Sequence, residues 1–159
     1  MTTTLTVREI LRRIDIFGEL SEEELSAVER CIERKSAASG ELLVREGEAS
    51  EELYIIETGE VCVFREAGGD GDVEAREEVK LATLGAGKCF GEMSLLDDLP
   101  PSASVRSTED CELLAIGRLD LNVLLNWDTI LAAKMWRTFA RMLSRRLRDA
   151  NDLISSGTL

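Results

Sequence analysis

The chain has 159 residues, of which 44% are hydrophobic and 31% are charged, and its formal net charge is -12. This length suits one domain with its own core, and the charge opposes DNA or an anionic membrane as a partner of the whole surface. The apolar runs are too short to cross a bilayer. The first residues, Met1-Thr2-Thr3-Thr4, lack the basic and apolar regions of a secretory signal. We therefore expect a cytoplasmic protein with no membrane partner.

Histidine is absent from the sequence, which excludes Ser-His-Asp and Cys-His catalysis. The four cysteines are widely spaced and form no CxxC pair, so a metal or haem site has few ligands. Three of them, Cys62, Cys89 and Cys111, lie in apolar or alternating stretches, where a reduced cysteine packs as a small core residue. Pairs of carboxylates are too common among 31 acidic residues to indicate acid–base catalysis. We expect no metal, no cofactor and no enzymatic activity.

Two helices are predicted before the first strand. Residues 5–13 have apolar side chains at helical spacing. The second helix begins after Ser21, whose hydroxyl caps free amides, while Glu24 completes a capping box. This helix is predicted to continue to about Arg34, because its apolar face contains Leu25, Val28, Cys31 and Ile32.

From Lys35 onward the pattern changes to short strands separated by glycine turns, which is typical of a barrel or roll. The loop at 68–72 joins two strands of a candidate hairpin. Its Asp70-Gly71-Asp72 lacks the ligand spacing of a calcium loop, so we interpret it as a plain turn. The predicted strands are 42–44, 53–56, 61–64, a return strand at 79–84, 103–105 and 111–116.

Two helices are predicted at the C-terminal end, over 119–127 and 130–153. The longer one carries an apolar stripe of Leu131, Met135, Phe139, Met142, Leu143 and Leu147. Its basic side is interpreted as solvated or partner-facing rather than nucleic-acid-binding. Helices first, a β region in the middle and a long helix last predict a single α+β domain. Its parts are the N-terminal helices (1–36), the roll (37–118) and the C-terminal helices (119–159).

Two motifs resemble the signatures of one known family. Residues 43–48, Leu-Val-Arg-Glu-Gly-Glu, precede Leu-Tyr-Ile-Ile-Glu-Thr-Gly at 53–59, and Phe-Gly-Glu-Met-Ser-Leu-Leu-Asp-Asp-Leu-Pro stands at 90–100. The first resembles the opening signature of the cyclic-nucleotide-binding domain family, apart from Ser50, and the second resembles its phosphate-binding cassette. The family includes the catabolite activator and protein kinase A regulatory subunits. The resemblance covers about residues 17 to 145 and implies a jelly-roll-like β-roll, with a cassette at 90–105 that contains a short helix.

The resemblance implies cyclic AMP or a related cyclic nucleotide as the ligand. In the family, the residue that matches Glu92 holds the ribose 2′-hydroxyl. A helix that opens near Gly91 offers free amides and a positive dipole end to a phosphate, and the glycine lets the backbone approach a ligand closely. The candidate contacts are Phe90, Gly91, Glu92, Met93, Ser94, Ser102 and Ala103.

The phosphate side departs from the family pattern of Pro-Arg followed by two small residues. Here the sequence is Pro100-Pro101-Ser102-Ala103, so Pro101 stands where the family has the arginine that pairs with the cyclic phosphate. Proline offers neither a charge nor an N–H. Loss of a hydrogen bond to a charged group costs about 1.5–3 kcal/mol, so we expect weakened or altered binding. Arg45 and Arg106 are candidates for compensation.

Two interpretations of function are open. One is a stand-alone regulatory domain that senses a cyclic nucleotide, with 119–127 as a hinge and the long helix as a lid over the base. The other is a degenerate, ligand-free scaffold that uses the roll and the helix for protein–protein contact or dimerisation. The stripe on 130–153 packs either on its own roll or on a second copy in a parallel homodimer. We expect no DNA-binding domain in this chain, so its output goes through a protein partner or oligomer state.

Overall fold

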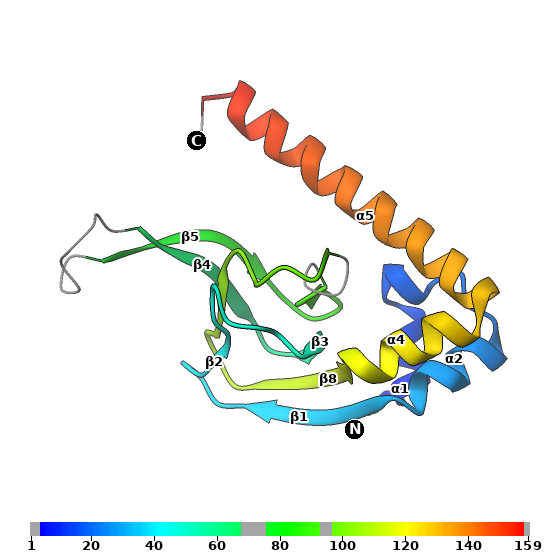
Figure 1. Cartoon of the computed structure of the whole chain (residues 1–159). Helices are drawn as coiled ribbons and strands as arrows, with labels where there is room; N and C mark the ends of the chain where they lie inside the picture. The colour runs from blue at the N-terminus through cyan, green and yellow to red at the C-terminus, as the bar shows by residue number, and fades with distance from the viewer. Residues whose placement is uncertain (1–3, 68–75, 93–96, 158–159) are drawn as a thin grey trace. The chain divides into compact units, whose positions relative to one another are not determined.

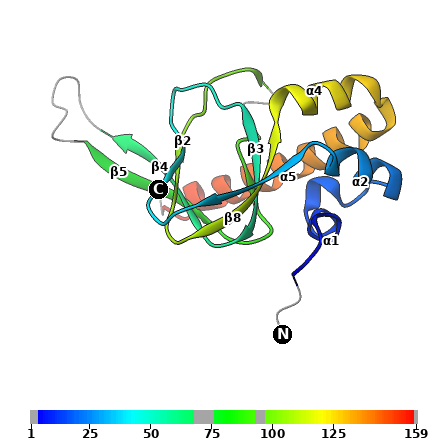
Figure 2. The ribbon, with the colours of Figure 1, turned by 90° about the horizontal axis from the view of Figure 1, so that it is seen from below.

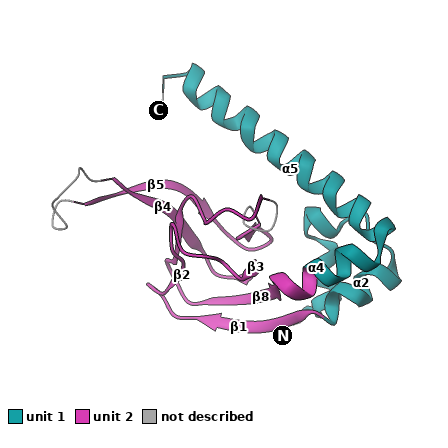
Figure 3. Ribbon diagram, viewed as in Figure 1, with its two compact units in different colours: residues 1–30, 122–159 teal, residues 31–121 magenta. Residues whose placement is uncertain are grey.

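A computed structural model of the chain describes residues 4–67, 76–92 and 97–157. It divides into two compact units, which Figure 3 shows in two colours. The β-roll unit is 31–121, and the helical unit combines 1–30 with 122–159. The division falls within the helix α4 (Arg118–Trp127). Each unit is built from different elements and is described by itself.

The β-roll unit consists of two four-stranded antiparallel sheets. The first has the order β1 (Ile32–Ala37), β8 (Cys111–Gly117), β3 (Glu52–Thr58) and β6 (Cys89–Phe90). The second has the order β2 (Leu42–Val44), β7 (Ser104–Ser107), β4 (Val61–Ala67) and β5 (Glu77–Leu84). Figures 1 and 2 show the strands from two sides, with β2 and β3 on opposite sides of the roll in Figure 2. The predicted α+β roll is confirmed.

The apolar side chains of the roll follow the period of two that a strand imposes. On β8, Cys111 and Leu113 belong to a buried cluster, and the alternate residues Leu114 and Ile116 are also fully buried. A strand that is buried on both faces reads as a continuous apolar run, as Leu-Leu-Ala-Ile does here. The cluster is completed by Ala37, Val44, Ile56, Val61, Phe90 and Val105.

The second helix is shorter than the sequence predicts. It begins as expected, with Ser21 accepting from the Glu24 amide in a capping box, but α2 ends at Glu29 (Glu22–Glu29). The prediction that it continues to Arg34 is wrong, because these residues start β1, which pairs with β8 from Ile32↔Ile116 to Ala37↔Cys111. The hydrogen bonds of that pairing come from a strand about 80 residues away in the sequence, which a local helical pattern does not reveal.

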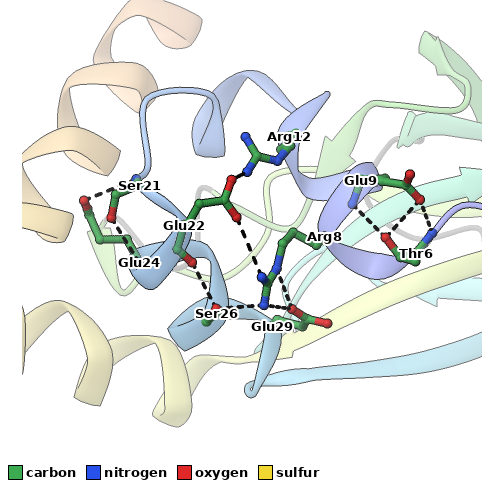
Figure 4. A network of polar contacts seen from close by, with 9 residues as sticks. All are labelled: Thr6, Arg8, Glu9, Arg12, Ser21, Glu22, Glu24, Ser26 and Glu29. Atoms are coloured by element: carbon green, nitrogen blue, oxygen red, sulfur yellow. Dashed lines mark hydrogen bonds and ion pairs between the residues drawn. The ribbon is translucent and has the colours of Figure 1, made fainter.

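The N-terminal helices of the helical unit are joined by polar contacts, drawn in Figure 4. The first helix, α1 (Val7–Arg12), begins after Thr6 in a capping box with Glu9 and is followed by a 3-10 turn, η1 (Asp15–Phe17). The Arg8 guanidinium donates to the Ser26 hydroxyl at 2.7 Å and to the Glu29 carboxylate at 2.9 Å, both on α2. A further ion pair joins Arg12 to Glu22.

The long helix α5 (Thr129–Ser155) packs on these N-terminal elements over its first half. Its buried residues are Leu131, Ala132, Met135, Thr138 and Phe139. The Thr138 hydroxyl donates to the Ile16 carbonyl at 3.0 Å, and Lys134 Nζ lies 2.6 Å from the Glu24 carboxylate. Within the described ranges, no helix combines the length and the apolar character that a membrane span needs.

Candidate ligand-binding site

A cavity of about 370 Å³ lies between β2 and β3 in the β-roll unit. This volume falls in the range of small-molecule sites. On its β3 side, the Tyr54 ring stacks on Phe90 of β6, with centroids 5.0 Å apart and planes 18° from parallel. The stack places the first residue of the predicted cassette beside the cavity. The lining residues are Leu42, Leu43, Val44, Arg45, Glu48, Ala49, Ser50, Glu51, Glu52 and Tyr54.

Gly91 approaches Glu52, one of the residues that line the cavity. It has a φ of +85°, and a Cβ built at this position would lie 2.6 Å from the Glu52 carbonyl oxygen. Both the left-handed backbone and the close approach require glycine. The sequence explains this glycine by approach to a ligand, and the structure adds approach to a neighbouring strand.

Glu92 follows Gly91 and is only 3% exposed. A carboxylate is rarely buried to this extent, because burial disfavours its charge unless polar groups hold it. The predicted ribose-side residue is therefore inside the fold rather than on its surface. Met93 and Ser94 lie outside the described residues, as does most of the short helix predicted there.

The segment around Pro101 is hydrogen-bonded to the turn between β2 and β3, although none of its residues lines the cavity. The Gly47 amide donates to the Pro101 carbonyl at 3.0 Å, and the Glu46 amide donates to the Ser104 hydroxyl at 2.9 Å. These bonds attach the proline segment to the β2–β3 turn, part of which lines the cavity. Pro101 and Ala103 are half-buried and Ser102 is exposed. One end of the predicted cassette therefore contacts β3, and the other end contacts the turn between β2 and β3.

The two arginines predicted as candidates have different surroundings. Arg45 lines the cavity, and its Nε lies 3.4 Å from a Glu48 oxygen, with both side chains largely exposed. The Arg106 Nη1 donates to both oxygens of Glu78 at 2.9 Å, and its guanidinium lies over the Phe64 ring at 4.5 Å from the centroid. Arg106 is thus held by β4 and β5, whereas Arg45 faces the cavity.

A further charged pair stands beside the cavity. Lys35 Nζ donates to the Glu52 carboxylate at 2.6 Å. This hydrogen bond raises the pKa of Lys35, although partial burial opposes the charge. Burial, together with the nearby Glu52 charge, raises the pKa of Tyr54, so its phenol stays neutral. Lys35 is consequently paired with the Glu52 carboxylate.

Sequence reasoning did not include Tyr54, Glu46 or Ser104 among the site residues. Tyr54 is the only tyrosine of the chain, and it stands two residues from Glu52, on the same face of β3. That period of two is a signal the sequence does carry. The bond from the Glu46 amide to Ser104 joins residues 58 positions apart, and no local pattern announces it.

The chemistry of the remaining groups is limited. Within residues 4–67, 76–92 and 97–157, no three or more cysteine and acidic side chains are arranged to hold a metal ion. The four cysteines form no disulfide with one another, and Cys89 and Cys111 are buried while Cys62 is half-buried. Burial raises the pKa of the Cys111 thiol, which makes it a poor nucleophile.

Comparison with known proteins defines the family. The model of the cyclic nucleotide-binding domain matches residues 34–128. The chain is 36% identical over 143 residues to the cyclic AMP receptor protein of Thermus thermophilus, covering 88% of this chain and 62% of that protein. It is 31% identical over 124 residues to a cAMP-dependent protein kinase regulatory subunit of Blastocladiella emersonii, covering 78% and 29%. The chain belongs to the cyclic nucleotide-binding domain family.

Solved structures agree with this assignment. A cyclic nucleotide-binding domain from Methylobacillus flagellatus has a TM-score of 0.79 at 30% identity, covering 96% of this chain and 83% of that one. The Thermus thermophilus catabolite activator protein has a TM-score of 0.72 at 34% identity, covering 89% and 63%. The chain spans about three-fifths or less of the curated relatives named here. Those relatives are a receptor and a regulatory subunit.

Proposed function

We propose that the chain is a regulatory domain that binds a cyclic nucleotide with a weakened phosphate contact. The observation that carries this proposal is the cavity of about 370 Å³ between β2 and β3. Its lining residue Glu52 contacts Gly91, which precedes the buried Glu92, and the turn that lines part of it is hydrogen-bonded to the Pro101 segment. A buried carboxylate suits a ribose hydroxyl as its partner, whereas Pro101 has no donor for a phosphate.

Ligand titration tests the proposal. Calorimetry and thermal denaturation of the full chain with cyclic AMP and cyclic GMP should show saturable heat and a rise in melting temperature. A ligand at 100 times its dissociation constant stabilises a one-site protein by about 2.7 kcal/mol. No heat and no thermal shift at millimolar concentrations of either nucleotide would contradict the proposal and favour the ligand-free scaffold.

The variant Glu92→Gln identifies the ribose side. It keeps the shape of the side chain and removes the charge-assisted acceptor, so affinity should fall about tenfold. 2′-Deoxy cyclic AMP serves as the matched probe, because it lacks the hydroxyl that Glu92 would bind. Equal losses for cyclic AMP and its 2′-deoxy analogue in this variant would remove Glu92 from the ribose contact.

A second property, dimerisation, is favoured by an exposed stripe on α5. Trp136, Leu147 and Ile154 are 42%, 63% and 62% exposed. Together with Ala140, Leu143 and Ala150 they repeat at alternating steps of four and three residues, the spacing of a coiled-coil seam. The residues that the sequence assigned to one stripe are divided: Leu131, Met135 and Phe139 are buried in the helical unit, and Leu147 is not.

We infer that this seam pairs α5 with α5 of a second copy. Sedimentation of the full chain should give a mass near twice 17.6 kDa, falling to one copy on dilution. A monomer at every accessible concentration would exclude the dimer. The output of the domain then passes through this helix or through a protein partner.

A further inference from the structure

We propose that Arg45 supplies the positive charge that pairs with the ligand's cyclic phosphate. It would replace the arginine that is missing at Pro101. The inference rests on the proposed function and names the residue that completes the same site. The phosphate-pairing charge then comes from the turn between β2 and β3 instead of from the cassette. The backbone bonds of that turn place it against the proline segment.

The position of Arg45 supports this assignment. The next residues of the chain, Glu46 and Gly47, donate their amides to Ser104 and to the Pro101 carbonyl at 2.9 Å and 3.0 Å. Arg45 is therefore one residue from a direct contact with the segment that lacks the arginine. It also lines the cavity itself. An arginine side chain is long enough to reach a phosphate from a neighbouring strand, and its planar donors suit phosphate oxygens.

Arg45 is also available. Its ion pair with Glu48 is 3.4 Å long, and the two side chains are 58% and 70% exposed. Such exposed pairs contribute little to stability, so a bound phosphate can replace Glu48 as the partner. This exchange keeps the guanidinium paired and leaves the Glu48 carboxylate in water.

The other cations near the cavity are already engaged. Arg106 holds both oxygens of Glu78 and covers the Phe64 ring. Arg65 donates from two nitrogens to one Glu46 oxygen at 3.0 Å and 2.8 Å. Lys35 is held by Glu52 at 2.6 Å. Among the described residues that line the cavity, Arg45 is the basic one.

The test compares Arg45→Gln with Arg106→Gln by calorimetry, using cyclic AMP and adenosine as probes. Adenosine lacks the phosphate, so it reports every other contact. For Arg45→Gln we expect cyclic AMP to bind about tenfold more weakly and adenosine to bind as before. Arg106→Gln should change both affinities less than twofold. A gain in cyclic AMP affinity on Glu48→Gln, which frees Arg45 from its partner, would support the exchange.

A double-mutant cycle with Pro101→Arg sharpens the result. Restoring the cassette arginine should raise affinity more in the Arg45→Gln background than in the native chain. The ligand has one phosphate, and in the native chain Arg45 already neutralises it. Unchanged cyclic AMP affinity in Arg45→Gln would overturn the inference, as would equal losses for cyclic AMP and adenosine. Absence of binding in the native chain would instead refute the proposed function, which the same titrations show before any variant is made.

Discussion

The β-roll unit and the helical unit are stabilised in different ways. In the roll, apolar side chains from both sheets form the buried cluster, and β8 is buried on both faces. In the helical unit, the first half of α5 buries Leu131, Met135 and Phe139 and also forms several ion pairs. Lys134 pairs with Glu24, and Arg137 and Arg141 both pair with Glu19. The roll therefore depends on packing, whereas the position of α5 depends partly on charge.

The two units also differ in the apolar side chains they expose. Seven of the eleven large apolar side chains that are exposed among the described residues belong to the helical unit, and most of these lie on α5. A globular unit rarely leaves contiguous apolar residues in water without a binding role. This contrast supports the two proposals made above, a ligand site in the roll and a partner contact on the helical unit. Four pairs of variants break or sharpen this comparison.

The largest effect is expected in the roll core. Leu113→Ala removes a side chain that is 1% exposed in the buried cluster, and such truncations cost about 2–5 kcal/mol. Leu147→Ala on α5 is the matched control, and its change should stay below about 0.5 kcal/mol in the monomer. Urea denaturation at low protein concentration measures both. Equal losses would show that the two units do not differ in this way.

Gly91→Ala should be the next most damaging change. Its left-handed φ alone costs about 1–2 kcal/mol for alanine, and contact with the Glu52 carbonyl adds to that cost. Gly87 has the same φ of +85° with nothing within 4 Å of a Cβ, so Gly87→Ala isolates the backbone contribution. A melting temperature lower for Gly91→Ala than for Gly87→Ala is expected. Equal losses would mean that the close approach to β3 relaxes at little cost.

The exposed seam of α5 is tested by Leu147→Glu. A charge at a seam position should weaken the proposed dimer about tenfold or more, while leaving monomer stability nearly unchanged. Leu153→Glu is the control, since Leu153 is 45% exposed on the same helix but off the seam. Sedimentation of both variants measures the effect. If Leu153→Glu dissociated the dimer and Leu147→Glu did not, the seam would be wrongly placed.

The smallest expected effect is on how the stability of the chain depends on pH in the acid range. Burial disfavours the Glu24 carboxylate, but hydrogen bonds from Lys134 and Ser21 outweigh it, and the pKa of Glu24 is lowered below 4.5. Its stabilisation is therefore present above the unfolded pKa and lost as pH falls from about 4.5. Glu24→Gln should cost about 1 kcal/mol at neutral pH and flatten this acid dependence.

The exposed neighbour Glu23 provides the control for that variant, because Glu23→Gln keeps the helix and the capping box. Thermal denaturation between pH 3 and pH 7 measures the acid dependence of each chain. An unchanged slope in Glu24→Gln would show that other carboxylates, such as Glu19, dominate the response to acid.

Local signals in the sequence predicted much of this architecture. Ser21 and Glu24 define the start of α2 because a capping box needs only four neighbouring residues. The glycine turns and the two signatures predicted the roll for the same reason, because each is formed by residues close together in the sequence. The start of β1 was missed because Ile32 takes its conformation from Ile116, far along the chain.

The site was predicted less completely than the fold. The roles of Glu92 and Pro101 stay predictions, although the structure buries Glu92 and bonds the Pro101 segment to the turn after β2. The sequence did not show that Arg106 is held by Glu78 and Phe64, because strand pairing brings those partners to it. The helical period on α5 likewise showed an apolar helix without showing that it carries two faces, one buried and one exposed. Burial is a tertiary property, and spacing alone does not supply it.

The stacking of Tyr54 on Phe90 has a practical consequence for measuring changes in the roll and changes in the helical unit separately. Tyr54 is the chain's one tyrosine and lies in the roll, whereas both tryptophans, Trp127 and Trp136, lie in the helical unit. Excitation at the red edge of the absorption band therefore reports on the helical unit alone, and the tyrosine signal arises only beside the cavity. The native chain thus carries its own spectroscopic labels, one for each unit.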